Sequence, residues 1–307
     1  MTNLENTNPN NYSEDKPLEL QELFKILWKE KRSIIIMASV FFAVATIYFW
    51  NKPDLYKSSA SMSVVEMGAG GGNSTASISL SGLRIETKGV KGPRYVNTVR
   101  SRAFFKHLVE TDEGFLPALM AIKSYDRKSA KTIYNSDVYD AANKKWLVGK
   151  PHYLIAYERY MEKMVIGFHQ ERYIIDISMD HVSPVAAKEM VESIIHKADQ
   201  MLRDFDLEAS SEALAYLTTA IPKQQQIALR SAMNDMIMNQ LETQMMTKIG
   251  PTYIIQVVDP PFVPLYRFAP NRTFISLGAG VVGLIFGIIF ILMRHFLPTL
   301  RKPASGS

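Results

Sequence analysis

Residues 33–50 read SIIIMASVFFAVATIYFW and residues 274–293 read FISLGAGVVGLIFGIIFILM, and neither stretch contains a charged residue. At about 1.5 Å per residue, a helix of either length nearly spans a hydrocarbon core of about 30 Å. Tyr48 and Trp50 close the first stretch as interfacial aromatics, and lysine or arginine flanks both stretches. The pattern therefore predicts two transmembrane helices, one toward each end of the chain, rather than buried helices of a soluble domain.

The first stretch could also be a cleaved signal peptide, because Ser58 and Ala60 resemble a small-residue cleavage site. Two features argue against this alternative. The apolar run follows a polar tail, and the small residues lie well beyond its bulky end. We therefore predict an uncleaved membrane anchor.

Lysine and arginine in short loops set the orientation of membrane spans, because they stay on the cytoplasmic side. Basic residues precede the first span and follow the second: Lys25, Lys29, Lys31 and Arg32, then Arg294, Arg301 and Lys302. Only Lys52 and Lys57 follow the first span closely. We expect an inner-membrane protein with both termini in the cytoplasm. The expected domains are a cytoplasmic tail and amphipathic helix (1–32), a first span (33–50), a periplasmic domain (51–273), a second span (274–293) and a cytoplasmic tail (294–307).

Composition narrows the class of protein further. The 307 residues are 47% hydrophobic and 21% charged, so the chain is neither disordered nor a polytopic membrane protein. The net charge of +5 is in part the basic bias that sets topology, and it does not indicate a nucleic-acid partner. There is no cysteine, so disulfides and thiol chemistry are excluded.

The segments beside the first span have simple patterns. Residues 1–17 are polar and are predicted to be disordered. Residues 18–32 place apolar side chains on one helix face, which predicts an amphipathic helix that lies on the inner leaflet or packs against a neighbour. Residues 68–72 form a glycine-rich loop without the Gly-Lys-Ser/Thr ending of a phosphate-binding loop.

The middle segment mixes strands and helices. β-Branched residues and alternation predict strands at 56–65, 173–179 and 252–258. Shorter helices are expected at 95–109 and 115–125, and residues 126–160 show no pattern that assigns them.

A long helix begins at Ser183-Pro184, with Ser as the N-cap and Pro at the first helical position. Its apolar face continues to Ile221, a length of roughly 55 Å at about 1.5 Å per residue. A second helix, 223–248, ends at Gly250-Pro251. The acidic residues of the long helix alternate with basic ones and predict a solvated or intersubunit face; they are Glu189, Glu192, Asp199 and Asp204.

The strands at 56–65 and 252–258 lie only a few residues from the spans, so both should sit at the base of the outer domain. The two long helices should then rise from this base and turn back near Pro222. We therefore expect an α/β membrane protein, in which two transmembrane helices flank a periplasmic α+β base with a long helical hairpin stalk.

Residues with catalytic potential are scattered. The six histidines form no HExxH motif, metal-ligand pair or triad, so we expect no catalytic, cofactor-binding or metal site. In the second span, Ala279, Gly283 and Gly287 repeat every four residues as a small-residue stripe for close helix packing, within or between subunits.

The chain resembles the Wzz family of polysaccharide co-polymerases, the chain-length determinants of bacterial O-antigen and related polysaccharides. The resemblance rests on LELQELFKILWKEKR before the first span, YKSSASMSVVE after it, and SPVAAKEMVESII at the start of the long helix. The family's Pro-rich element before the second span is represented by Asp259, Pro260, Pro261, Pro264, Pro270 and Arg272. The chain has Leu265-Tyr266-Arg267 where a further proline is often found, and its outer domain is short for the family.

The resemblance implies a regulator that is not itself an enzyme and that needs no cofactor. It implies a homo-oligomeric ring or cone in the periplasm, with a separate polysaccharide polymerase as partner and the growing glycan as a candidate contact. Pro264 and Pro270 are then the residues expected to couple the stalk to the membrane, since proline fixes φ and limits bending.

Two alternatives remain. The chain could be a two-span subunit of a capsule export system driven by an ABC transporter, which a neighbouring transporter ATPase gene would indicate. A tyrosine autokinase of the same superfamily would need a separate kinase polypeptide, because this sequence contains no Walker motif.

Overall fold

The computed structural model describes residues 27–65, 79–80, 83–84, 91–250 and 252–300. It divides into two compact units. The helical unit comprises Met1–Lys52 and Pro270–Ser307, and the central unit comprises Pro53–Ala269. The predicted tail 1–17, most of the amphipathic helix 18–32 and the glycine-rich loop 68–72 lie outside the described residues.

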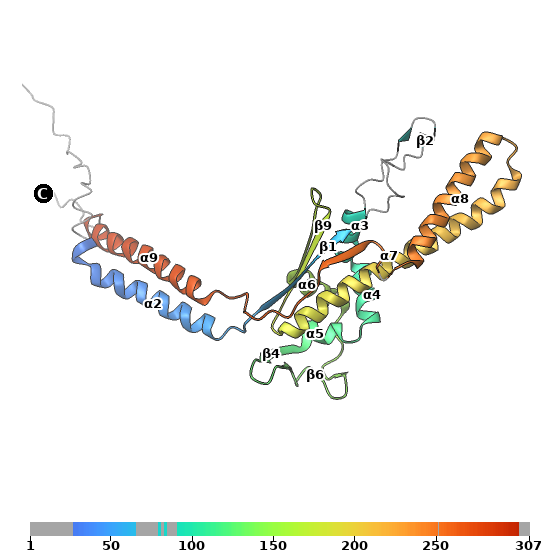
Figure 1. Cartoon of the computed structure of the whole chain (residues 1–307). Coiled ribbons are helices and arrows are strands. Elements are labelled where there is room, and N and C mark those ends of the chain that lie inside the picture. The colour runs from blue at the N-terminus through green and yellow to red at the C-terminus, as the bar shows by residue number, and fades with distance from the viewer. Residues whose placement is uncertain (1–26, 66–78, 81–82, 85–90, 251, 301–307) are drawn as a thin grey trace, which may run out of the picture. The chain divides into compact units, whose positions relative to one another are not determined.

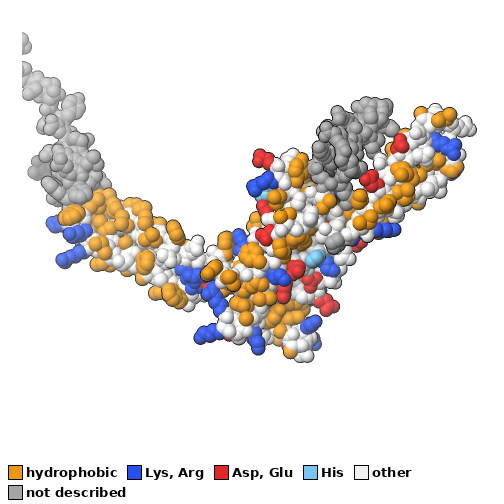
Figure 2. Space-filling view, in the orientation of Figure 1, with side chains coloured by type: hydrophobic (Ala, Val, Ile, Leu, Met, Phe, Trp, Pro, Cys, Tyr) orange, Lys and Arg blue, Asp and Glu red, His pale blue; other side chains and the backbone are white. Residues whose placement is uncertain are grey.

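The helical unit is a pair of apolar helices, α2 (Lys31–Trp50) and α9 (Arg272–Leu300), packed against each other (Figure 1). The predicted spans 33–50 and 274–293 lie within them, and both helices are long and apolar enough to cross a membrane. Figure 2 shows hydrophobic side chains over the visible face of the pair, with Lys and Arg at its two ends. Phe41 and Phe286 stack between the helices, with ring centroids 5.8 Å apart.

The central unit contains a four-stranded sheet in the order β10-β1-β9-β8, and each neighbouring pair is antiparallel. The strands are β1 (Tyr56–Val64), β8 (Met164–His169), β9 (Ile174–His181) and β10 (Ile255–Asp259). Every second residue of β1 is buried, which is the period of a strand with one face against a core. The mixed helix-and-sheet fold is therefore confirmed, as an α+β arrangement.

Helices pack on the buried side of this sheet. The long helix α7 (Pro184–Ala220) contacts both β1 and β9. The shorter helices are α3 (Lys91–Val99), α4 (Arg102–Thr111), α5 (Phe115–Ala121) and α6 (Tyr153–Lys163). Their largest fully buried side chains, Tyr95, Phe104, Phe105, Phe115 and Tyr160, join the sheet residues in one core.

The single helix predicted at 95–109 is wrong, because the structure divides it into α3 and α4. Ser101 has an extended backbone, with φ −77° and ψ 148°, and its Oγ accepts a hydrogen bond from the Phe104 amide. This N-cap starts a new helix at Arg102 and turns the chain between the two.

The helix predicted at 115–125 is too long, since α5 ends at Ala121 and β4 (Ile122–Asp126) follows. β4 pairs with β5 (Lys131–Tyr134), and a second small hairpin joins β6 (Tyr139–Asp140) to β7 (Lys145–Trp146). These hairpins and α6 occupy the stretch 126–160 that the sequence pattern leaves unassigned. Another short pair, β2 (Ser79–Leu80) and β3 (Leu83–Arg84), precedes α3.

The predicted long helix begins where expected. The Ser183 Oγ accepts from the Ala186 amide, and Pro184 is the first residue of α7. The helix ends at the 3-10 turn η1 (Ile221–Lys223), and α8 (Ile227–Lys248) packs back against it as a helical hairpin (Figure 1). The side-chain Nε2 of Gln244 donates to the Ser211 Oγ across the hairpin at 2.9 Å.

The strand predicted at 252–258 is displaced toward the C-terminus, to 255–259. Its first residues are not in the sheet ladder, because the Asp199 carboxylate accepts the amides of Tyr253 and Ile254. β10 begins only after these two amides are satisfied.

Candidate functional site

The Pro-rich connector, residues 259–272, follows β10, and its part up to Ala269 lies in the central unit. Its backbone pairs with the residues just before β1. The Leu55 amide donates to the Ala269 carbonyl at 2.8 Å, and the Phe268 amide donates to the Leu55 carbonyl at 2.7 Å. The Ser58 hydroxyl, buried on β1, donates to the Phe262 carbonyl at 2.8 Å. The connector is thus held at two separated points, at Leu55 just before β1 and at Ser58 on β1.

Charged side chains reinforce these backbone contacts. The Lys57 Nζ lies 3.7 Å from the centroid of the Phe268 ring, a cation–π contact. Arg267 Nη1 lies 3.5 Å from a carboxylate oxygen of Asp54. The two pairs join the end of the connector to the start of β1 and to the segment just before it.

The prolines of the connector differ in their surroundings. Pro264 is buried, Pro260 is exposed, and Pro261 and Pro270 are partly buried. Leu265 and Tyr266, at the positions where the family pattern has a further proline, are each 84% exposed. The connector therefore projects two large side chains into solvent between its two attachment points.

Arg272 belongs to the helical unit, at the first position of α9. Its guanidinium donates to the Lys52 carbonyl at 2.9 Å and lies 6.0 Å from the centroid of the Trp50 ring. It therefore links the start of α9 to the end of α2.

The small residues of the second helix lie at the contact with α2. Gly283 and Gly287 are buried, and Ala279 is partly buried. A Cβ at Gly283 would lie 2.7 Å from the Phe41 Cβ and 3.0 Å from the Ala38 Cα. A Cβ at Gly287 would lie 3.3 Å from the Ile34 Cα. These distances place both glycines where the backbones of α2 and α9 approach closely within one chain.

Asp199 does not lie on the solvated or intersubunit face that the charge pattern predicts. It is 5% exposed, and its carboxylate accepts three hydrogen bonds of 2.8–3.0 Å from the amides of Tyr253 and Ile254. Glu189 and Asp204 are exposed as expected. The buried carboxylate instead joins α7 to the chain that enters β10.

A second polar link lies further along α7. The Arg94 guanidinium of α3 makes two hydrogen bonds with Asp206, at 2.6 and 3.0 Å. The Tyr253 hydroxyl donates to the same carboxylate at 2.9 Å. Burial, and then the hydrogen bond to Asp206, raise the pKa of Tyr253, so its phenol stays protonated. Two aspartates of α7 thus bind α3 and the segment that enters β10.

Among the described residues, no group of three or more His, Cys, Asp or Glu side chains could hold a metal ion. The histidine with the most enclosed environment is His181, at the end of β9. Its Nδ1 accepts from the Ser183 amide at 3.0 Å, so the proton lies on Nε2, which donates to the Ala118 carbonyl at 2.9 Å. This neutral ring joins β9, α5 and the start of α7.

Lowering the pH is expected to weaken this junction. Burial lowers the pKa of His181, and the positive charges of Lys163 and Arg159 act in the same direction. The unfolded chain, with an ordinary pKa of about 6.5, then binds a proton at a higher pH than the folded protein. The contribution of His181 is complete above about pH 6.5 and falls as the pH drops toward the folded pKa, by at most about 1.4 kcal/mol per pH unit.

Unfolding of the full-length protein by urea at pH 7.5 and pH 5.5 measures this dependence. The pH dependence should be shallower in His181→Gln than in the wild type. His196→Gln, at an exposed position of α7, is the matched control and should keep the wild-type dependence. Equal pH dependence in all three proteins would contradict the role of His181.

Comparisons with known proteins match part of the chain to one family. Residues 16–107 match the family model described as Wzz, chain length determinant protein. No curated protein matches the chain. A solved structure described as a full-length bacterial polysaccharide co-polymerase has a TM-score of 0.42 and 15% sequence identity, and the match covers 93% of this chain and 100% of that chain. The resemblance inferred from the residues is confirmed for residues 16–107, which match the model of the Wzz family of chain length determinant proteins.

Proposed function

We propose that the protein regulates the chain length of a surface polysaccharide of the O-antigen type. The observation that carries this proposal is the match of residues 16–107 to the chain length determinant family. The protein acts without catalysis of its own, and a separate polymerase in the inner membrane adds the repeat units.

In this proposal α2 and α9 span the inner membrane, and both termini are cytoplasmic. The central unit then stands in the periplasm, with the sheet at the membrane as a base and the α7–α8 hairpin as a stalk. The excess of Lys and Arg before the apolar stretch 33–50 and after the apolar stretch 274–293 supports the orientation. Only short stretches of chain separate α2 from β1 and β10 from α9, which supports a base close to the membrane.

We further propose that the working form is a homo-oligomer. Support comes from the α7–α8 hairpin, which exposes several large apolar side chains. Exposed apolar surface of this kind often marks a contact with another protein chain. Those more than half exposed are Phe205, Tyr216, Ile227, Met238 and Met245. Analytical ultracentrifugation of the detergent-purified protein should detect species larger than a monomer, and a strict monomer at every concentration would count against self-association.

Deletion of the gene tests the proposed function directly. The surface polysaccharide should still be made, but its modal length should change, because the polymerase remains while its regulator is lost. A gel of polysaccharide from the wild type, the deletion strain and a complemented strain measures this. An unchanged ladder would reject the proposal, and complete loss of surface polysaccharide would instead favour an export subunit.

The Pro264→Ala and Pro270→Ala double variant is expected to alter the length distribution while the protein remains in the membrane. Alanine frees φ at two positions of the connector, which weakens the mechanical link between α9 and the sheet. The readout is the polysaccharide ladder of a deletion strain that expresses the variant. Pro151→Ala, outside the connector, is the control, and a wild-type ladder from the double variant would refute the role of the two prolines.

A further inference from the structure

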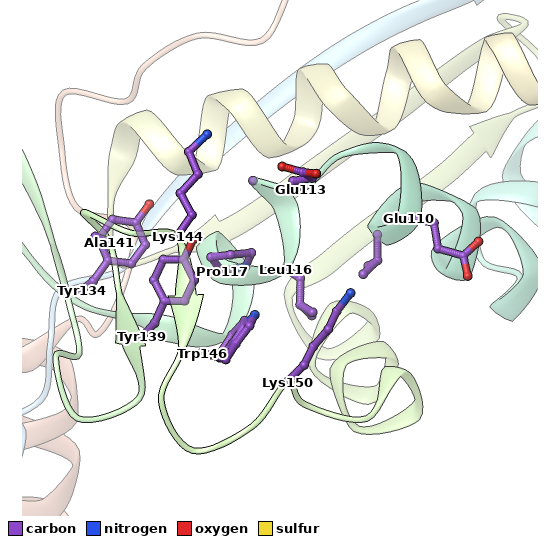
Figure 3. Close-up of a pocket in the computed structure, with 12 residues that line it drawn as sticks. Glu110, Glu113, Leu116, Pro117, Tyr134, Tyr139, Ala141, Lys144, Trp146 and Lys150 are labelled. Atoms are coloured by element: carbon purple, nitrogen blue, oxygen red, sulfur yellow. The ribbon is translucent and has the colours of Figure 1, made fainter.

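The central unit contains a cavity of about 570 Å³ that is separate from the connector and from the α2–α9 contact. It lies between the α4–α5 turn and the small hairpins at 131–146, and residues from these segments line it (Figure 3). Its volume is within the range of about 300–1,000 Å³ that is usual for small-molecule sites.

One wall of the cavity is aromatic. The ring centroids of Tyr134 and Tyr139 are 5.6 Å apart, and those of Tyr139 and Trp146 are 5.1 Å apart. Burial raises the pKa of Tyr134, so its hydroxyl remains a hydrogen-bond donor. Three neighbouring rings therefore form a continuous apolar surface with polar groups at its edge.

The hairpin that carries two of these rings is held in place by its own turn. Tyr139 and Trp146 are paired across β6 and β7. The Asp140 carboxylate accepts from the amides of Ala142 and Asn143 and from the Asn143 side chain, at 2.8–3.3 Å. A ligand that stacks on these rings therefore meets a preformed surface and loses little affinity to ordering of the protein.

The polar lining carries both signs of charge. Glu110 and Glu113 come from the α4–α5 side, and Lys144 and Lys150 lie before and after β7. Figure 3 shows Lys150 and Glu110 on one side of Trp146 and the two tyrosine rings on the other. The carboxylates disfavour a phosphate, and the ammonium groups disfavour a metal ion. A neutral ligand that both donates and accepts hydrogen bonds suits a lining with two carboxylates and two ammonium groups.

From this lining we propose that the cavity binds one pyranose residue of a carbohydrate chain. A pyranose presents C–H groups on its face, which suit an aromatic surface, and hydroxyls around its rim. The face stacks on Trp146, which is partly exposed and backed by the buried Tyr139, while rim hydroxyls donate to Glu113 and accept from Lys150. The natural ligand, which rests on the proposed function, is a residue of the polysaccharide whose length is regulated.

Saturation-transfer NMR of the full-length protein in detergent micelles tests this site. The probe is the polysaccharide released by mild acid from the strain that carries the gene. We expect transfer to sugar ring protons and saturable binding. Trp146→Ala and Glu113→Gln should each weaken binding by roughly tenfold, the change expected on loss of one good contact. Tyr216→Ala, an exposed aromatic on α7 outside the cavity, is the matched control.

The two variants separate binding from folding. Trp146 also packs against the core, so its loss could unfold the hairpin, whereas Glu113 is exposed and its change to Gln alters charge alone. No transfer to the sugar, unchanged binding in both variants, or displacement of the sugar by inorganic phosphate would overturn the proposal. A changed polysaccharide ladder in the deletion strain without sugar binding would reject this site alone. Sugar binding with an unchanged ladder would reject the proposed function and keep the site.

Discussion

Asp199→Ala is expected to lower the free energy of unfolding of the central unit by about 3 kcal/mol or more. The wild-type carboxylate accepts the amides of Tyr253 and Ile254, and Asp199, Tyr253 and Ile254 are each 5% exposed or less. Removal of the carboxylate leaves two buried N–H donors without this acceptor, at about 1–3 kcal/mol for each. It also removes an ion-pair partner of Arg203, whose Nη2 lies 3.6 Å from the carboxylate and whose guanidinium also donates to the Gly250 carbonyl.

Thermal unfolding of the full-length protein, followed by circular dichroism, measures the loss of stability. Hydrogen exchange at the amides of Tyr253 and Ile254 gives a local readout, and both should exchange faster in the variant. Asp204→Ala, on the exposed side of the same helix, should change stability by less than about 0.5 kcal/mol. If Asp199→Ala has the melting temperature of the wild type, and if both amides exchange as slowly as in the wild type, the carboxylate does not hold β10 to α7.

The sequence pattern does not reveal this role, because it is non-local. On α7 an acidic residue among basic ones has the periodicity of a solvated face, and Asp199 differs from Asp204 only in what lies opposite. The segment opposite is residues 253–254, which come back to α7 after the whole hairpin. To predict the hydrogen bonds of Asp199 one must know the path of the chain from α8 to β10. The residue pattern of a single helix gives no information on that path.

Features with local causes were predictable. The start of α7 follows from Ser183-Pro184, an N-cap and first-turn pair that acts within four residues. The two apolar helices follow from uninterrupted hydrophobic runs, and β1 follows from its alternation. The break between α3 and α4 also has a local cause, the Ser101 cap, but apolar residues at helical spacing on both sides conceal it.

The connector and the cavity depend on tertiary contacts. Ser58 holds the connector because it occupies a buried position of β1 opposite Phe262, yet in the sequence it is one of several serines in a polar strand. The cavity brings Glu113 near Trp146 through two small hairpins in the stretch 126–160, which has no clear period. Both sites arise from the pairing of short segments, where sequence patterns carry the least information.

Gly283→Val is expected to separate α2 from α9. The Cβ of any side chain at this position would meet the Ala38 Cα at 3.0 Å and the Phe41 Cβ at 2.7 Å, and a backbone atom cannot yield without displacing its helix. Overpacking of this kind costs about 1–3 kcal/mol. That cost corresponds to about a 5- to 150-fold shift from paired toward separated helices.

A disulfide reporter measures this shift in the membrane. The hydroxyls of Thr46 and Ser276 are 3.0 Å apart across the two helices, and the chain has no cysteine, so Thr46→Cys with Ser276→Cys gives one defined cross-link. Oxidation should cross-link the reporter protein rapidly, and addition of Gly283→Val should slow the reaction several-fold. Gly278→Val is the matched control, because no atom lies within 4 Å of a Cβ at Gly278, and it should leave the rate unchanged. Equal cross-linking rates in the two glycine variants would show that close approach at Gly283 does not hold the helices together. Aromatic contacts such as Phe41 with Phe286 would then account for the packing of the two helices.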